Sequence, residues 1–71
     1  MTEIKIRDEF IKLGQALKLA GIVQSGVEAK YMIEEGNVLV NGEVDTRRGK
    51  KLRDGDIVAA DGKEFTVRSA E

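Results

Sequence analysis

The sequence contains no cysteine, no histidine, no proline and no tryptophan. Without cysteine, the chain can form neither a disulfide framework nor a thiolate metal site. It has no cysteine or histidine for nucleophilic or general-base work, and no pair of carboxylates stands in an apolar setting. We therefore expect a protein that is not an enzyme and that uses no metal and no cofactor.

Long hydrophobic runs are absent as well. The longest uninterrupted apolar run is about four residues, whereas a membrane-spanning helix needs about 20. The first ten residues are charged and alternating, unlike a secretory signal peptide. A length of 71 residues, with 41% hydrophobic and 35% charged residues, is typical of one globular domain spanning 1–71. We expect a monomeric, cytoplasmic protein without a membrane segment.

The charges nearly balance, because twelve basic and thirteen acidic residues give a formal net charge of −1. This balance argues against a protein that coats nucleic acid indiscriminately, since such a domain is normally basic overall. The basic residues are nevertheless concentrated in one short segment without an acid: Arg47, Arg48, Lys50, Lys51 and Arg53. Such clustering predicts one positive region on an otherwise acidic protein.

The middle of the chain contains the clearest local signals. Ser25 and Glu28 have the spacing of a capping box, in which each side chain accepts a hydrogen bond from the other residue's backbone N–H. Gly36 should end this helix in a left-handed conformation. The apolar, β-branched segment Val38–Val40 predicts a strand, and Asn41-Gly42 is typical of a two-residue hairpin turn.

Hydrophobic periodicity predicts the other elements. Apolar residues at i, i+3, i+4 and i+7 indicate a helix over 13–20, ended by Gly21. We expect strands over 2–6, at a sheet edge, and over 43–45, 56–60 and 63–68. Residues 10–12 fit either a short strand or the start of a helix, and 69–71 should form a frayed tail. The fold class is α+β: two short helices packed on a small, mostly antiparallel sheet of about four or five strands.

The run LGQALKLAGIVQSGVEAKYMIEEGNVLVNG, followed by RRGKKLRDGDIV, resembles the RNA-binding domain named after small-subunit ribosomal protein S4. The core of that family is the αL motif, in which two helices precede a strand and a loop with basic residues. The matching positions are Leu17-Lys18, Ser25-Gly26, Ala29-Lys30, Ile33, Gly36, Val38, Val40-Asn41-Gly42, Arg47-Arg48, Lys50-Lys51 and Gly55-Asp56. The whole chain looks like the small stand-alone bacterial members.

The resemblance implies a protein that binds structured RNA, expected to be ribosomal RNA or a ribosomal subunit, and that assists ribosome assembly or another RNA process. Arginine suits bidentate contact with phosphate, and an exposed tyrosine can stack on an unpaired base. The candidate RNA-binding residues are Lys18, Ser25, Lys30, Tyr31, Asn41, Arg47, Arg48, Lys50, Lys51 and Arg53.

Several candidates also have a purely structural explanation. Ser25 is most simply a helix cap, and Asn41 is first of all a turn residue. Lys30 could pair with Glu34 within its helix, and the ring of Tyr31 could lie flat on the protein's own surface. A run of basic residues is most often a solvated loop. The family spacing favours RNA binding over these explanations for the basic segment.

A different class of function is a β-grasp-like protein-interaction module with no RNA role. Val40–Val44 and Asp54–Val58 also resemble the sulfur carriers of thiamine synthesis. Those carriers end in Gly-Gly, whereas this chain ends in Ser69-Ala70-Glu71. They also have one helix where this sequence predicts two, so RNA binding is the favoured hypothesis.

Overall fold

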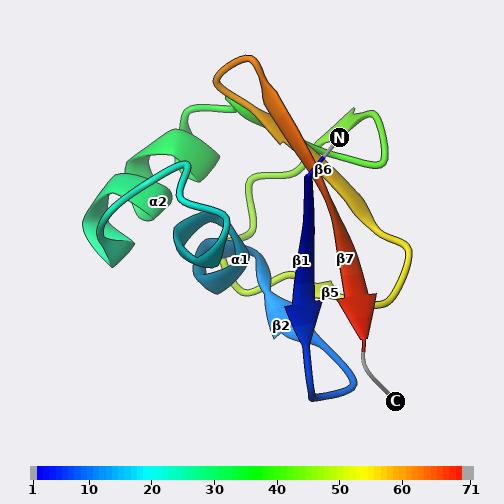
Figure 1. The fold of residues 1–71 in the computed structure, drawn as a ribbon. Helices are drawn as coiled ribbons and strands as arrows, with labels where there is room; N and C mark the ends of the chain where they lie inside the picture. The colour runs from blue at the N-terminus through cyan, green and yellow to red at the C-terminus, as the bar shows by residue number, and fades with distance from the viewer. Residues whose placement is uncertain (1, 70–71) are drawn as a thin grey trace.

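The computed structural model describes residues 2–69, in which two helices lie on one side of a twisted sheet (Figure 1). The elements are β1 (Thr2–Ile6), β2 (Ile11–Lys12), α1 (Leu13–Leu19), α2 (Gly26–Glu34), β3 (Val38–Val40), β4 (Glu43–Val44), β5 (Lys51–Leu52), β6 (Ile57–Ala60) and β7 (Lys63–Ser69). This is the predicted α+β architecture.

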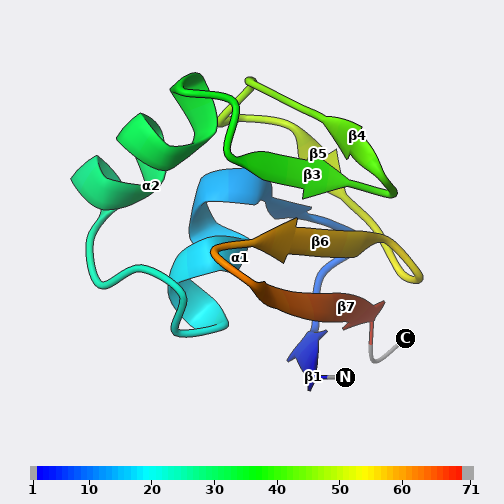
Figure 2. The same ribbon diagram turned by 90° about the horizontal axis from the view of Figure 1, so that it is seen from above.

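The main sheet has five strands in the order β1-β7-β6-β3-β4, as Figure 2 shows from above. All neighbours are antiparallel except β1 and β7, which pair in parallel from Thr2 opposite Phe65 to Ile6 opposite Ser69. The expected edge position of the first strand is therefore confirmed. Its parallel pairing with the final strand was not predicted, since no local signal reports which distant strand an edge strand will join.

Both helices end in the same glycine motif. Gly21 and Gly36 each have a φ of +80°, a left-handed conformation that glycine adopts without steric penalty. After α2, the N–H of Gly36 donates to the Ile33 carbonyl, and the N–H of Asn37 donates to the Met32 carbonyl. These bonds satisfy carbonyls that the helix itself leaves open. The predicted helix ends are therefore confirmed, with Ala20 as the capping residue after α1.

The core lies between the helices and the inner face of the sheet. Its fully buried side chains include Leu13 and Leu17 from α1, Ile33 from α2, and Phe65 from β7. Met32 of α2 is only partly buried against this core. In so small a domain, nearly every buried apolar side chain is needed for stability.

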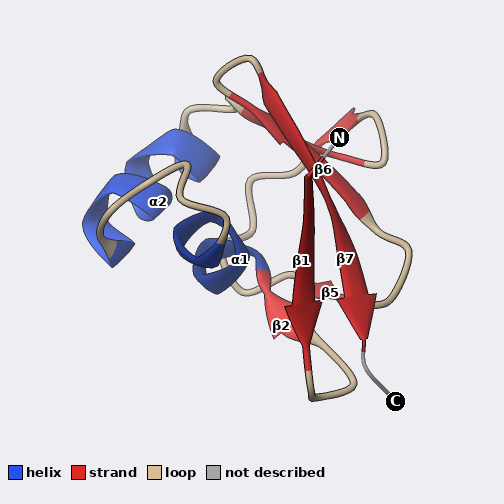
Figure 3. Ribbon diagram, in the orientation of Figure 1, coloured by secondary structure: helices blue, strands red, loops and turns tan. Residues whose placement is uncertain are grey.

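A second, two-stranded sheet joins β2 and β5, with Ile11 opposite Leu52 and Lys12 opposite Lys51. This pairing resolves the ambiguity at 10–12, because the short strand leads directly into α1. The basic segment was expected to be all loop, but Lys51 and Leu52 form a strand whose leucine is buried in the core. Figure 3 shows the loop after β4 running from the hairpin towards α1.

Several predicted strand boundaries differ from the structure, and β6 begins at Ile57 instead of Asp56. The hairpin strand ends at Val44, and Asp45 turns inward instead of continuing it. Ser69 belongs to β7, and its N–H donates to Asp54 Oδ1 at 2.9 Å. The predicted frayed tail is therefore wrong for Ser69, while positions 70 and 71 lie outside the described residues.

Candidate nucleic-acid interface

The basic loop is fixed to the first turn of α1 by backbone hydrogen bonds. The N–H of Leu13 donates to the Lys50 carbonyl at 2.8 Å, and the N–H of Gly14 donates to the Arg48 carbonyl at 3.1 Å. The capping residue, Lys12, supplies no side-chain hydrogen bond to α1. The loop carbonyls therefore cap α1, because they accept hydrogen bonds from N–H groups that have no partner within the helix.

Glycine at position 14 lets Arg48 lie close to α1. A Cβ atom built on Gly14 would stand 2.9 Å from Arg48 Cγ, closer than real Cβ contacts. The side chain of Arg48 therefore occupies the space that a larger residue would fill. This arrangement holds the stem of one loop arginine against the helix that carries Lys18.

A groove of about 400 Å³ lies between this loop and the two helices. Among residues 2–69, its walls carry three cationic side chains, those of Lys12, Lys18 and Arg48, and no carboxylate. The groove, called the basic groove below, is lined by Lys12, Gly14, Gln15, Lys18, Gly26, Ala29, Arg48 and Gly49. Residues distant in sequence thus create a cationic concavity that suits an anion.

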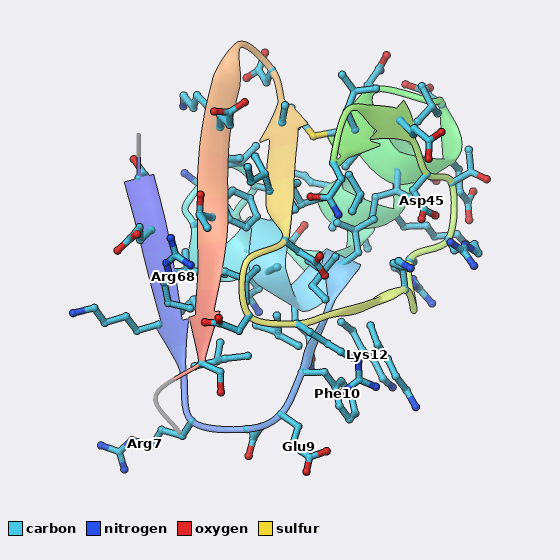
Figure 4. All side chains as sticks on the ribbon, turned by 90° about the vertical axis from the view of Figure 1, so that its right-hand side faces the viewer. Arg7, Glu9, Phe10, Lys12, Asp45 and Arg68 are labelled. Carbon is cyan, nitrogen blue, oxygen red and sulfur yellow. The ribbon has the colours of Figure 1, made fainter. Side chains whose placement is uncertain are left out.

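The small sheet extends this positive region. Lys12 and Lys51 stand directly opposite each other in the β2–β5 pair, so their side chains share a face. Lys51 Nζ lies 4.9 Å and Arg53 Cζ lies 5.7 Å from the centroid of the Phe10 ring. Figure 4 shows Phe10 and Lys12 on the same side of the molecule. We call the set Lys12, Lys18, Arg48, Lys51 and Arg53 the basic surface.

Two other loop cations face the β3–β4 hairpin, away from the basic groove. Arg47 and Lys50 line a hollow that also contains the carboxylates of Glu43, Asp45 and Asp56. Arg47 forms a two-pronged ion pair with Asp45, with Nη2 to Oδ2 at 2.8 Å and Nε to Oδ1 at 3.0 Å. The loop therefore presents its cations in two directions, which spacing alone does not reveal.

Asp45 is 8% exposed, and it also accepts the backbone N–H of Arg47 at 2.9 Å. The side-chain hydrogen bond from Arg47 is the main reason why the pKa of Asp45 lies below its ordinary value. Burial acts in the opposite direction but is outweighed. The charged aspartate therefore stabilises the bend through which the basic loop leaves the hairpin.

We expect Asp45→Asn to lower the stability of the fold at neutral pH, because the ion pair with Arg47 is lost. The stabilisation should be complete above the ordinary aspartate pKa of about 3.9 and disappear as pH falls through the lower folded value. Urea midpoints measured from neutral to strongly acid pH should therefore converge for the two proteins. Glu3→Gln, in the exposed pair with Arg68, is the matched control and should change the midpoints little. An equal deficit of Asp45→Asn at every pH would contradict the ionic explanation.

The side chain of Asn41 forms hydrogen bonds with the start of β6, the strand next to its own hairpin. Its side-chain oxygen accepts the N–H of Ile57 at 2.9 Å, and its Nδ2 donates to Asp56 Oδ1 at 3.1 Å. Its φ of +52° confirms the predicted turn conformation. These bonds support the turn explanation for this residue.

The candidate RNA-binding residues at α2, which are Ser25, Lys30 and Tyr31, do not gather at one place on the surface. The Ser25 hydroxyl accepts the N–H of Glu28 at 3.2 Å, as predicted, but the Glu28 carboxylate accepts from Gln24 and not from Ser25. Lys30 is exposed one turn beyond Gly26, which lines the basic groove. The ion pairs formed within residues 2–69 do not include the Lys30–Glu34 pair considered above.

Tyr31 is 60% exposed and lies apart from the basic surface. It lines a hollow with Glu28, Glu35 and Asp61, whose carboxylates make the surroundings acidic. The structure therefore does not bring this ring together with the cations of the loop.

Sequence reasoning missed two residues of this region, Phe10 and Lys12. Both fall in the segment with an ambiguous secondary structure. The only available signal was the alternation of an aromatic, an apolar and a basic residue just before the first helix. The β2–β5 pairing that gives this segment its significance joins positions far apart in the sequence.

Other kinds of site find little support in the described part of the chain. Within residues 2–69, no three acidic side chains gather so that they could hold a metal ion. Neither α1 nor α2 is long and apolar enough to cross a membrane.

Comparisons with known proteins agree with this geometry. The profile of the S4 domain family matches residues 4–68. The chain is 54% identical over 59 residues to the probable ribosome maturation protein RlbA of Bacillus subtilis, covering 83% of each protein. It is 40% identical over 57 residues to the putative RNA-binding protein YbcJ of Escherichia coli, covering 80% of this chain and 81% of YbcJ.

A solved structure shares the fold. The solution structure of Escherichia coli YbcJ superimposes with a TM-score of 0.76 and 34% sequence identity. The match covers 97% of this chain and 89% of YbcJ. That structure is described as revealing an αL motif involved in RNA binding. The helix pair and the strand and loop that follow it are therefore the shared αL architecture.

Proposed function

The chain belongs to the S4 domain family, and on this premise we propose that it binds structured RNA through its basic surface. It would act by binding alone, without catalysis. The relatives' names, a ribosome maturation protein and an RNA-binding protein, support RNA as the partner. The helix pair of the αL architecture favours this function over the β-grasp-like alternative.

One observation carries the proposal: three cations, those of Lys12, Lys18 and Arg48, line one groove of a chain whose net charge is −1. Lys12 and Lys51 even stand directly opposite each other, an arrangement that destabilises a two-stranded sheet. The Phe10 ring attracts one of the two ammonium groups, that of Lys51, from 4.9 Å. An anionic partner that contacts both ammonium groups would relieve their repulsion.

The basic groove is the proposed phosphate-contact region. Arg48 can bind a phosphate through two N–H groups, and Lys18 supplies a point charge on the facing helix. Gly26, the first residue of α2, lines the same groove, and the N-terminus of a helix favours phosphate. Ser25 would contribute indirectly, because its side chain caps this end of α2. Lys30 would extend the contact along α2. Arg47, Lys50 and Asn41 would have a supporting role around the hairpin, and Tyr31 no direct one.

We further propose that the bound RNA is ribosomal RNA and that the protein assists maturation of a ribosomal subunit. The similarity to the Bacillus subtilis protein over 83% of both chains supports this choice. A domain of this size would bind as a monomer in the cytoplasm, where ribosomal RNA is folded and assembled. Recognition would depend on RNA shape more than on a base code.

The test is binding of a ribosomal RNA fragment at several salt concentrations. Five phosphate contacts predict a loss of affinity of roughly 100- to 500-fold between about 50 and 200 mM salt, because bound cations displace the counterions of the RNA. Binding can be followed by fluorescence anisotropy of the labelled RNA. An affinity that ignores salt, or a protein partner that survives ribonuclease treatment while RNA does not bind, would favour the protein-interaction alternative.

A further inference from the structure

The two phenylalanines of this chain have different environments. Phe65 is 1% exposed and belongs to the core. Phe10 is only half-buried, in the connection between β1 and β2. Figure 4 shows its ring projecting beside Lys12 at the end of the molecule away from the β6–β7 turn. A ring that stays partly in water gives up some of the stabilisation it would gain by burial.

The ring of Phe10 holds two cations of the basic surface. Lys51 Nζ and Arg53 Cζ lie 4.9 and 5.7 Å from its centroid, within the range of cation–π attraction. Such contacts limit the freedom of two long side chains. Phe10 therefore keeps two positive charges at a fixed place beside an aromatic surface.

The same ring also lines an apolar hollow of about 640 Å³. Ile6, Ile11 and Leu19 form its apolar walls, and Leu19 is 56% exposed. Polar groups come from Asp8, Gln15 and Lys18. We call this site the Phe10 hollow. Gln15 and Lys18 line the basic groove as well, so the two concavities are neighbours on one surface.

We propose that the Phe10 hollow receives one unpaired nucleobase of the RNA bound at the basic surface. This inference rests on the proposed function. A nucleotide joins a flat, largely apolar ring to an anionic phosphate, and the site joins an apolar wall to Lys18, Lys51 and Arg53. The base would pack against Phe10 and Leu19, and the cations would contact the phosphates on either side of it.

Only an unpaired base suits this site, because a base within a duplex is stacked between its neighbours and cannot enter a side hollow. The Gln15 amide both donates and accepts hydrogen bonds, so it can meet the polar edge of a base. The Asp8 carboxylate can only accept hydrogen bonds, so it favours a base edge that carries an amino group as donor. The preferred RNA is therefore a helix interrupted by a bulge or loop.

The experiment compares three versions of one RNA hairpin: with a single bulged 2-aminopurine, with an abasic site in its place, and fully paired. The protein should bind the bulged hairpin about tenfold more tightly than the other two, a typical effect of one stacked base. Binding should also change 2-aminopurine fluorescence. Phe10→Leu should abolish both the preference and the fluorescence change, whereas Tyr31→Leu, which removes an exposed ring outside the site, should abolish neither.

Equal, salt-dependent affinity for all three hairpins would overturn this proposal and leave RNA binding intact. No binding to any hairpin, at any salt concentration, would overturn the proposed function as well. Displacement of the bulged hairpin by an equal concentration of an acidic peptide with one phenylalanine would assign the hollow to a protein partner instead.

Discussion

Replacing Lys18 and Arg48 together by glutamate should weaken the binding of a ribosomal RNA fragment by about a hundredfold at moderate salt. Both side chains line the basic groove, from α1 and from the loop. Each substitution removes a phosphate contact and adds a negative charge that repels the RNA. The slope of log affinity against log salt concentration should also become shallower, by the amount expected for the loss of about two phosphate contacts. Anisotropy titrations over a range of salt measure both quantities.

The matched control is Lys5→Glu with Lys63→Glu, which makes the same change in net charge. Both lysines are exposed, and neither lines the basic groove or the Phe10 hollow. This control should lose only a few-fold in affinity, since exposed charges beyond about 10 Å are largely screened. Equal losses in the two double variants would mean that overall charge, and not the basic groove, determines binding.

Replacing Phe65 by alanine should remove a large part of the protein's stability. The side chain is 1% exposed in the centre of β7, where Phe65 pairs with Val58 of β6 and Thr2 of β1. Truncating a buried phenylalanine typically removes about 3–5 kcal/mol of stability. A domain of this size has only about 4–10 kcal/mol in total. Urea denaturation followed by circular dichroism should show a strongly lowered midpoint, or no folded baseline.

The same truncation at Phe10 tests whether the effect comes from burial. Phe10→Ala removes an identical group from a half-buried position, so it should lower stability by about 1 kcal/mol or less. The two variants therefore separate the core ring from the surface ring. If Phe10→Ala were as destabilising as Phe65→Ala, the Phe10 hollow would be part of the core and unsuitable for an incoming base.

Much of this fold can be predicted from local sequence because its boundaries are set by local chemistry. The Ser25 cap, the two glycine helix ends and the Asn41-Gly42 turn each depend on residues within a few positions of one another. The pairings of β1 with β7 and of β2 with β5 join segments distant in the chain. No periodicity within a strand identifies such a partner.

The candidate site also combines features that local sequence predicts with features that depend on distant segments. Family spacing identified the loop cations, and the structure brings Lys18 and Arg48 into one groove. Spacing could not show that Asp45 engages Arg47, or that Tyr31 lies among carboxylates. It also missed Lys12, whose relevance depends on its cross-strand neighbour. Side-chain direction is set by tertiary contacts, so a list of cations does not predict a surface.

The parallel pairing of β1 with β7 also bears on how the molecule is made. Among residues 2–69, β1 has its one sheet neighbour in β7, a strand that is synthesised much later, with Thr2 opposite Phe65. Until then Ile4 and Ile6 lack the packing that covers them in the finished domain. Contacts between such distant segments slow folding. The sheet is therefore completed only after β7 has been synthesised, and a nascent chain that stops before Lys63 should remain open at this edge.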